Sequence, residues 1–312
     1  MNMLRDAKLM EVIPWHDVNS FTSIAVRWKT LPSVAFRTIN AGYTPSEGDV
    51  EQVWESVFVL GGEIKYDRLF EKVKGNSIVD FKKLHTDMKL KALALQFNNY
   101  LINGDHGSDP DGFEGLKKRV TNMPSRQLVG FAGASAAALD PTASVANGRA
   151  FFNKFEEMHY KTNGGNVNAI LCNEGIYYGM GAVARYIQAT GGNMLSVTKD
   201  SFDRDITTWK GAPLIDTGLL KDQTTEIITE TEVAGDAGAD ATSIYMLSFD
   251  EMQGILGIQL PPGLEVYDPL NGGEQESTPT KLLRVEWPLG LAGFGSYGFV
   301  RGWNVEGASN WT

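Results

Sequence analysis

The sequence predicts an α+β protein built around a mixed β-sheet, with one long helix and an extended hairpin. Short β-prone runs bounded by turn residues recur along most of the chain, whereas only three segments have the spacing of helices. No internal repeat is present. With 312 residues, 42% hydrophobic and 21% charged, the chain is long enough for one large domain or two modest ones with a sizeable core.

The N-terminal quarter indicates an irregular arm followed by a hairpin. Residues 1–24 carry few periodic signals. Residues 24–28 are β-prone, residues 50–59 alternate, and turn-forming residues lie between them. We therefore predict a long hairpin with a wide loop over residues 24–66, interrupted by the Gly-Gly pair at 61–62. Apolar residues occur on both of its faces, so the hairpin should lie on another surface.

The strongest helical pattern covers residues 76–103. Phe81, Leu84 and Met88 have helical spacing, Asn76 or Ser77 can cap the start, and Asn103-Gly104 ends the helix. An Asp-rich loop, residues 104–112, follows and resembles a calcium loop. Its register fails, because Lys118 would stand where the bidentate Glu belongs, and the loop therefore predicts a turn.

The remaining two thirds of the chain alternates between helix and strand. Small, flexible residues at 125–143 predict a domain boundary, and helices are expected at 143–161 and 177–190. Strands are expected at residues 167–172, 212–216, 226–229, 243–248, 264–267, 282–287 and 297–302.

Motifs that carry chemistry do not support an enzyme. A GxGxxA match that begins at Gly179 falls inside a predicted helix, not directly after a strand where a phosphate loop should be. P-loop, HExxH and GxSxG patterns are absent from the sequence, and its four histidines are dispersed. Cys172 lies in an apolar run and is expected in the core. We assign no catalytic, cofactor-binding or metal residue, although a pair of carboxylates acting as acid and base stays open.

The charge of the chain is negative and unevenly distributed. The formal net charge is −10, and the stretch between Lys221 and Lys281 contains twelve acidic residues and no Lys or Arg. General acidity disfavours tight binding to nucleic acid. The acidic stretch predicts either a solvated face or a specific cation site. The sequence shows neither a signal peptide nor a membrane span, so we expect the protein in the cytoplasm of the cell that makes it.

The order of these elements resembles that of the major capsid proteins of tailed bacteriophages, which have the Hong Kong 97-type fold that encapsulins share. The resemblance covers most of the chain from about residue 24. Its most similar stretches are residues 36–42 (FRTINAG), the pattern from Leu101 to Leu116, residues 209–218 (WKGAPLIDTG) and the closing segment from Trp287 to Trp303.

The resemblance implies a domain organisation. It implies an N-terminal arm at 1–24, an extended hairpin (the E-loop) at 25–66, a peripheral domain with a spine helix at 67–125 and 280–312, and an axial domain at 126–279. No long N-terminal helical extension is present, so a separate scaffolding protein or a processed chain is expected. The Lys, Asn and Glu of an isopeptide cross-link cannot be placed, and none is predicted.

The resemblance also implies a function. Subunits would form hexamers and pentamers of an icosahedral shell around double-stranded DNA, in the head of a virion, without sequence-specific DNA binding. Scaffolding, portal and decoration proteins would be partners, and a membrane would not. The hairpin would meet neighbouring subunits through its large apolar residues. These residues are Trp28, Phe36, Tyr43, Trp54 and Phe58.

Two other functions stay open, and the acidic stretch adds one hypothesis. An encapsulin-type compartment would share the fold, and an enzyme with an unrecognised site would not need it. If axial domains meet around one axis, five or six copies of the acidic stretch would repel each other or bind divalent cations. Glu230, Glu232, Asp236 and Asp240 are the residues chosen to test that hypothesis.

Overall fold

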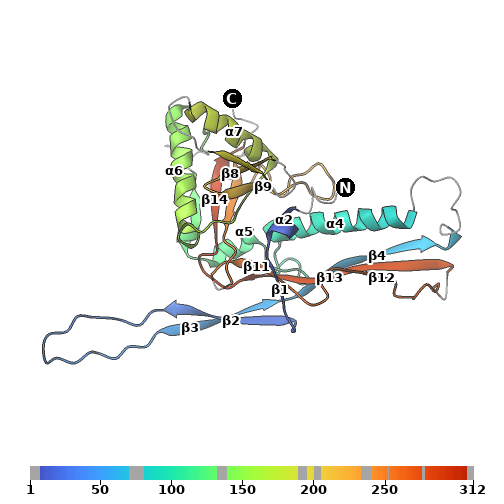
Figure 1. The fold of residues 1–312 in the computed structure, drawn as a ribbon, viewed down its shortest axis with the longest axis horizontal. Coiled ribbons are helices and arrows are strands. Elements are labelled where there is room, and N and C mark those ends of the chain that lie inside the picture. The colour runs from blue at the N-terminus through green and yellow to red at the C-terminus, as the bar shows by residue number, and fades with distance from the viewer. Residues whose placement is uncertain are drawn as a thin grey trace.

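The computed structural model of the chain describes residues 8–69, 81–131, 139–188, 195–199, 205–232, 241–251, 253–275 and 278–307. Figure 1 shows three parts: an upper unit of helices over a sheet, a long lower layer, and a narrow ribbon that projects from the lower layer. The helices are α2 (Lys8–Val12), α4 (Phe81–Asn103), α5 (Leu116–Arg119), α6 (Val145–Lys161) and α7 (Glu174–Gln188).

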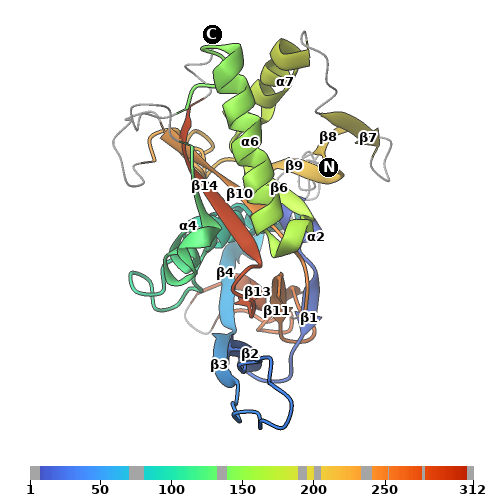
Figure 2. The ribbon, with the colours of Figure 1, turned by 90° about the vertical axis from the view of Figure 1, so that its left-hand side faces the viewer.

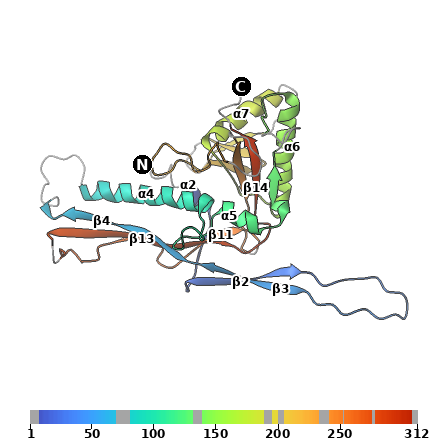
Figure 3. The ribbon, with the colours of Figure 1, turned by 180° about the vertical axis from the view of Figure 1, so that it is seen from behind.

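The lower layer is a sheet with the long helix α4 lying along it (Figures 1 and 3). Among the described residues its strand order is β1-β11-β13-β12, and β4 pairs antiparallel with β13 along the whole of β4. Its strands are β1 (Trp15–Asp17), β4 (Phe58–Asp67), β11 (Ile255–Gln259), β12 (Glu265–Tyr267) and β13 (Thr280–Gly293).

The upper unit is a mixed sheet with α6 and α7 on one face (Figure 2). Among the described residues its order is β5-β14-β10-β6-β9-β8-β7, with parallel and antiparallel pairs. Its strands are β5 (Leu128–Gly130), β6 (Ala169–Cys172), β7 (Ser196–Lys199), β8 (Asp205–Trp209), β9 (Ala212–Asp216), β10 (Ala241–Leu247) and β14 (Phe299–Glu306).

Successive side chains of the central strand β10 point alternately into two apolar clusters, and this strand thereby joins the two units into one body. Ile244 and Met246 are fully buried in the cluster beneath α6 and α7. Tyr245 and Leu247 point to the other face and are buried in the cluster that holds Phe97 of α4. Because both faces of the strand are covered by apolar side chains, the upper sheet forms the middle layer of the molecule.

The structure confirms the α+β prediction and several element boundaries. The helix expected up to Asn103 ends there, and the two later helices appear at 145–161 and 174–188. Ser144 caps the first of these through its side chain, which accepts a hydrogen bond from the Asn147 amide. Gly179 lies inside α7, as expected for a segment that is not a phosphate loop. The expected helix start at 76–80 lies outside the described residues, as does the middle of the boundary segment, at 132–138.

The structure corrects four predictions. Residues 8–17 are not an irregular lead-in: they form α2 and β1, and Leu9 is buried in the core. The Gly-Gly pair at 61–62 does not interrupt the hairpin but lies within β4. A Cβ on Gly61 would stand only 2.5 Å from the Val285 carbonyl oxygen of β13, so glycine lets the two strands approach.

The remaining two corrections concern strand pairing. Residues 226–229 form no strand, and only an isolated bridge joins Leu219 to Glu226. The expected hairpin over 24–66 is divided between two sheets. Its outer part pairs β2 (Thr22–Thr30) with β3 (Asp49–Ser56), whereas β4 leaves it to pair with β13.

Candidate assembly surface

The ribbon formed by β2 and β3 has one apolar face and one charged face. In the antiparallel register Ile24 lies opposite Trp54 and Trp28 opposite Val50, so these side chains share a face. The apolar face is completed by Val26, two residues from Ile24 and from Trp28 on the same strand. Its members are exposed, at 70% for Trp28 and 61% for Trp54. We call these five residues the ribbon face.

The opposite face of the ribbon is held by ion pairs. Arg27 Nη2 lies 2.9 Å from Glu51 Oε2, and Lys29 Nζ lies 3.6 Å from Asp49 Oδ2. Exposed cross-strand pairs of this kind each contribute little to stability, about 0.2–1 kcal/mol. They nevertheless leave the ribbon with one face suited to water and one suited to another apolar surface.

The ribbon ends in an extended loop, residues 31–48, which we call the tip. Its large apolar side chains are almost fully exposed. Arg37 Nη1 donates to the Ala41 carbonyl at 3.2 Å and its guanidinium stands 5.3 Å from the Tyr43 ring centroid. The tip is thus shaped by a few contacts of its own. These exposed side chains are Leu31, Val34, Phe36, Ile39 and Tyr43.

Four of the five residues predicted for the subunit interface lie on this surface. Trp28 and Trp54 belong to the ribbon face, and Phe36 and Tyr43 to the tip. Phe58 differs, because it lies on β4, is half-buried against the core of the lower layer, and stands 5.5 Å from the ring of His106. Its side chain is already engaged within the subunit.

Sequence reasoning missed part of this surface. Ile24, Val26 and Val50 are exposed on the ribbon face beside the two tryptophans. The signal was present, since Ile24, Val26 and Trp28 alternate along one strand. Alternation alone does not indicate which face is exposed, and the sequence predicted apolar residues on both faces.

The base of the ribbon is joined to the body by a buried ion pair. Arg119 of α5 donates to both carboxylate oxygens of Glu55 of β3, at 2.5 and 2.8 Å. Their side chains are 12% and 11% exposed. Val57, the next apolar residue, is buried in a small cluster with Ile258 of β11. The ribbon therefore leaves the body at a defined place.

One of the four acidic residues chosen to test the charge-repulsion hypothesis is buried in ion pairs. Glu232 is 6% exposed and lies between two cations, with Lys117 Nζ at 2.5 Å and Arg301 Nη2 at 3.2 Å. Its choice as a surface charge was wrong. Glu230 is half-buried, and Asp236 and Asp240 lie outside the described residues.

The surroundings of Glu232 shift its pKa downward. Burial alone raises the pKa of this carboxyl. Attraction to Arg301, hydrogen bonds from Lys117 and Ser243, and the charge of Lys117 together outweigh burial. Arg301 Nη2 and Glu232 Oε2 are close enough for an ion pair, but their geometry is not that of a hydrogen bond. The net pKa shift of Glu226 is in the opposite direction. Burial raises its pKa, and a hydrogen bond from Asn173 does not offset this effect.

The Asp-rich loop forms the predicted turn. Asp105 accepts hydrogen bonds from the Gly107 amide at 3.0 Å and from Lys118 Nζ at 3.4 Å. In the part of the chain that the structure describes, three or more His, Cys, Asp or Glu side chains do not come together as a metal site would require. None of the described helices is long and apolar enough to cross a membrane.

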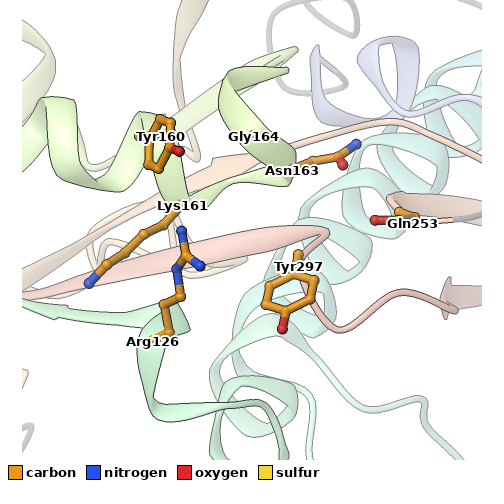
Figure 4. A pocket seen from close by; sticks show the side chains of 7 residues that line it. All are labelled: Arg126, Tyr160, Lys161, Asn163, Gly164, Gln253 and Tyr297. Atoms are coloured by element: carbon orange, nitrogen blue, oxygen red, sulfur yellow. The ribbon is translucent and has the colours of Figure 1, made fainter. Parts of the chain in front are cut away.

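An open pocket of about 220 Å³ lies beside the C-terminal end of α6 (Figure 4). Arg126, Tyr160 and Tyr297 project around it, and the Arg126 guanidinium stands 6.0 Å from the Tyr160 ring centroid. Lys161 points away and pairs with Glu157 at 2.6 Å. Among the described residues, its lining contains no serine, cysteine or carboxylate side chain.

Comparisons with known proteins find relatives by family model and by structure. Residues 2–140 match the family model described as major capsid protein GP7. The encapsulin of the holo-SrpI complex from Synechococcus elongatus PCC 7942 has a TM-score of 0.66 at 14% identity, over 100% of this chain and 91% of the encapsulin chain. A search of curated proteins found no match.

Two further solved structures are similar over nearly the whole chain. The capsid of a native GTA particle has a TM-score of 0.63 at 15% identity, over 96% of this chain and 90% of the other. A chain of Gordonia phage Cozz has a TM-score of 0.56 at 13% identity, over 95% of this chain and 85% of the other. At such identities the likeness identifies a shared fold.

Proposed function

We infer that this chain is a major capsid protein with the Hong Kong 97-type fold, a structural subunit that assembles with copies of itself into the shell of a phage head. The family match over residues 2–140 and the fold shared with phage and GTA capsid chains support the inference and agree with the resemblance in the sequence. The observation that carries it is the exposed ribbon face with the exposed tip beyond it.

A surface of this kind is costly to leave in water. Burying a large apolar side chain stabilises a protein by about 1.5–3 kcal/mol, so the ribbon face and tip together favour association strongly. Trp and Tyr are also the residues that concentrate at the centres of protein interfaces. The ribbon of one subunit would therefore lie on its neighbour.

The position of the ribbon suits a head-to-tail contact between copies of the chain. The ribbon projects from one end of the lower layer, and α4 and β4 extend toward the other (Figure 1). A contact between two different surfaces of the same chain repeats from copy to copy and closes when the rotation allows it. We propose rings of six and five subunits closing an icosahedral shell.

The finer features of the proposal follow the resemblance. The ribbon and tip would form the outer part of the E-loop at 25–66, and α4 the spine helix of the peripheral domain. The upper unit would be the axial domain at 126–279 with β14 added from 280–312, and β11 and β12 would join the peripheral domain because they lie in the lower sheet. The shell would assemble in the host cytoplasm with scaffolding, portal and decoration proteins and enclose double-stranded DNA. An acidic subunit with a net charge of −10 suits a container that does not grip its DNA. We propose no catalytic activity and no cofactor.

An encapsulin-type compartment is the second candidate, because the encapsulin chain shares the fold with a TM-score of 0.66. The two candidates differ in content. Particles purified from producing cells would contain nuclease-protected double-stranded DNA in a phage head and protein cargo in a compartment. The match to a capsid family model favours the phage head.

The ribbon face provides the test of the proposed function. Trp28→Ser with Trp54→Ser should change the free energy of unfolding of the isolated subunit by no more than about 0.5 kcal/mol, because both residues are exposed. Assembly, followed by light scattering, should be lost. Val197→Ser, at an exposed apolar residue of β7, is the matched control and should assemble normally. Normal shells from the double variant would contradict the proposed role of the ribbon face.

A further inference from the structure

The short helix α5 is connected by ion pairs to three separate parts of the molecule. Lys117 pairs with Glu232, which lies against the upper sheet and also faces Arg301 of β14. Lys118 pairs with Asp105 in the loop after α4. Arg119 pairs with Glu55 at the base of the ribbon. Three consecutive cations on a helix point in different directions, so each reaches a different partner.

The three connections are not equivalent. Lys118 and Asp105 are both substantially exposed, and Lys117 is exposed although its partner is buried. Only Arg119 and Glu55 are both shielded from water, with exposures near one tenth. A shielded pair is weakly screened by salt and keeps a fixed geometry, whereas exposed pairs exchange with water.

Arg119 is held on every side. Besides its two hydrogen bonds to Glu55, its Nε donates to the Glu114 carbonyl at 2.8 Å and its Nη2 to the Leu291 carbonyl at 2.7 Å. Glu55 also accepts from the Gly293 amide at 3.2 Å. The planar fork of the guanidinium thus joins β3, the start of α5 and the end of β13 in one network, which a lysine could not do.

Besides this network, the ribbon is attached at its base through Val57, which is buried against Ile258, and through β4, which follows β3 and pairs with β13. The strand β2 pairs only with β3, among the described residues, and β3 meets the lower layer near Ser56. The Val57 amide donates to the Phe21 carbonyl at 2.8 Å. This hydrogen bond links the two sides of the ribbon to each other and not to the body. Glu55 lies within β3, on the ribbon side of these attachments, so the groups that hold Glu55 help to set the direction of the ribbon.

We propose that Arg119 is the positioning residue that fixes the angle at which the ribbon leaves the subunit, with α5 as the joint between ribbon, α4 loop and upper unit. Arg119 touches no part of the ribbon face or tip, so it acts on assembly only through the ribbon's direction. The effect of Arg119 on assembly rests on the proposed function, because a ribbon held at one angle lets each subunit contact its neighbour in the same orientation. The angle itself is a property of the single subunit.

The angle can be measured in the unassembled subunit with two spin labels. Cys172 is the chain's single cysteine and is buried, so labels attach to introduced cysteines. Lys29→Cys places one label on the outer part of the ribbon, and Asp87→Cys places the other on the exposed side of α4. Double electron–electron resonance then reports the distribution of distances between ribbon and body. The parent should give one narrow peak.

Arg119→Met combined with Glu55→Met removes both charges and leaves no unpaired one buried. The narrow peak should be lost and replaced by a broad distribution, while circular dichroism stays that of the parent. Arg119→Lys keeps a charge but not the fork, and should give an intermediate width. Lys118→Met, the adjacent residue of the same helix, should keep the narrow peak. If the double variant does not fold, Glu55→Gln should still broaden the peak.

Two results would overturn the proposal. One is a broad distribution already in the parent, and the other is a narrow parental peak that survives in folded variants of Arg119 and Glu55. Both are independent of the proposed function, which fails instead if the parent never assembles. When the parent does assemble, the folded double variant should lose closed shells of uniform diameter, and Lys118→Met should keep them.

Discussion

At the scale of single residues, Glu232 shows how a buried charge depends on its partners. The carboxylate lies between Lys117 and Arg301, and its pKa is held below the usual value of about 4.3 for Glu. A carboxyl with a lowered pKa in the folded state adds stability above its ordinary pKa and loses that stability as the pH falls through the lowered value.

We predict that Glu232→Gln lowers the free energy of unfolding of the isolated subunit by about 3 kcal/mol at neutral pH, because it leaves Arg301 buried without a counter-charge. The difference from the parent should shrink as the pH falls below about 4. Urea unfolding across this range measures both effects. Glu230→Gln is the control and should cost less than about 0.5 kcal/mol. A difference that is constant with pH would contradict the electrostatic explanation.

Cys172 gives a second prediction at this scale. Its side chain is buried in the cluster beneath α6 and α7, as its apolar sequence neighbours predicted, and burial raises the pKa of the thiol. The thiol should not react with a disulfide reagent in the native protein and should react once per chain in denaturant. Absorbance of the released thiolate measures this. Rapid reaction in the native state would show that the strand β6 is not buried as described.

At the scale of elements, local signals predicted helices better than strands. The helices 145–161 and 174–188 appear near their expected places, because helical spacing and the Ser144 cap are encoded by neighbouring residues. The strands β1 and β11 were not predicted. These two strands pair in parallel although one lies near the N-terminus and the other beyond residue 250. No local sequence pattern identifies so distant a partner.

The candidate site divides in the same way. The exposure of Trp28 and Trp54 within the subunit could be predicted, because a hairpin without a core of its own cannot bury its large apolar residues. The pairing of Arg119 with Glu55 could not, since a charged side chain in sequence gives no indication of its partner. Glu232 was misjudged for that reason, as its cations come from α5 and β14.

The tip gives a prediction at the scale of elements. Thr30 and Asp49 are the last paired residues of the ribbon, so replacing residues 31–48 by Asn-Gly would close β2 and β3 with a two-residue turn. The subunit should fold with a free energy of unfolding within about 0.5 kcal/mol of the parent, because the removed residues are exposed. Shell formation should be lost.

This replacement leaves Glu55 and Val57 in place, where they pack against the body. Thermal unfolding followed by circular dichroism tests folding, and light scattering tests assembly. A variant that fails to fold would show that the tip contributes to the core of its own subunit.

At the scale of the whole molecule, the layered body and the projecting ribbon have different roles. The body has two extensive apolar clusters, so we expect it to fold without a neighbouring subunit. The ribbon face and the tip have no such coverage within the subunit. The apolar side chains of the ribbon face and the tip would therefore be buried only when a neighbouring subunit covers them.

The most direct test of this account is electron microscopy of the purified protein, with light scattering on the same sample and with a scaffolding protein added where the chain alone does not assemble. The account predicts rings or closed shells of uniform diameter. A stable monomer of 34.2 kDa under all of these conditions would contradict it.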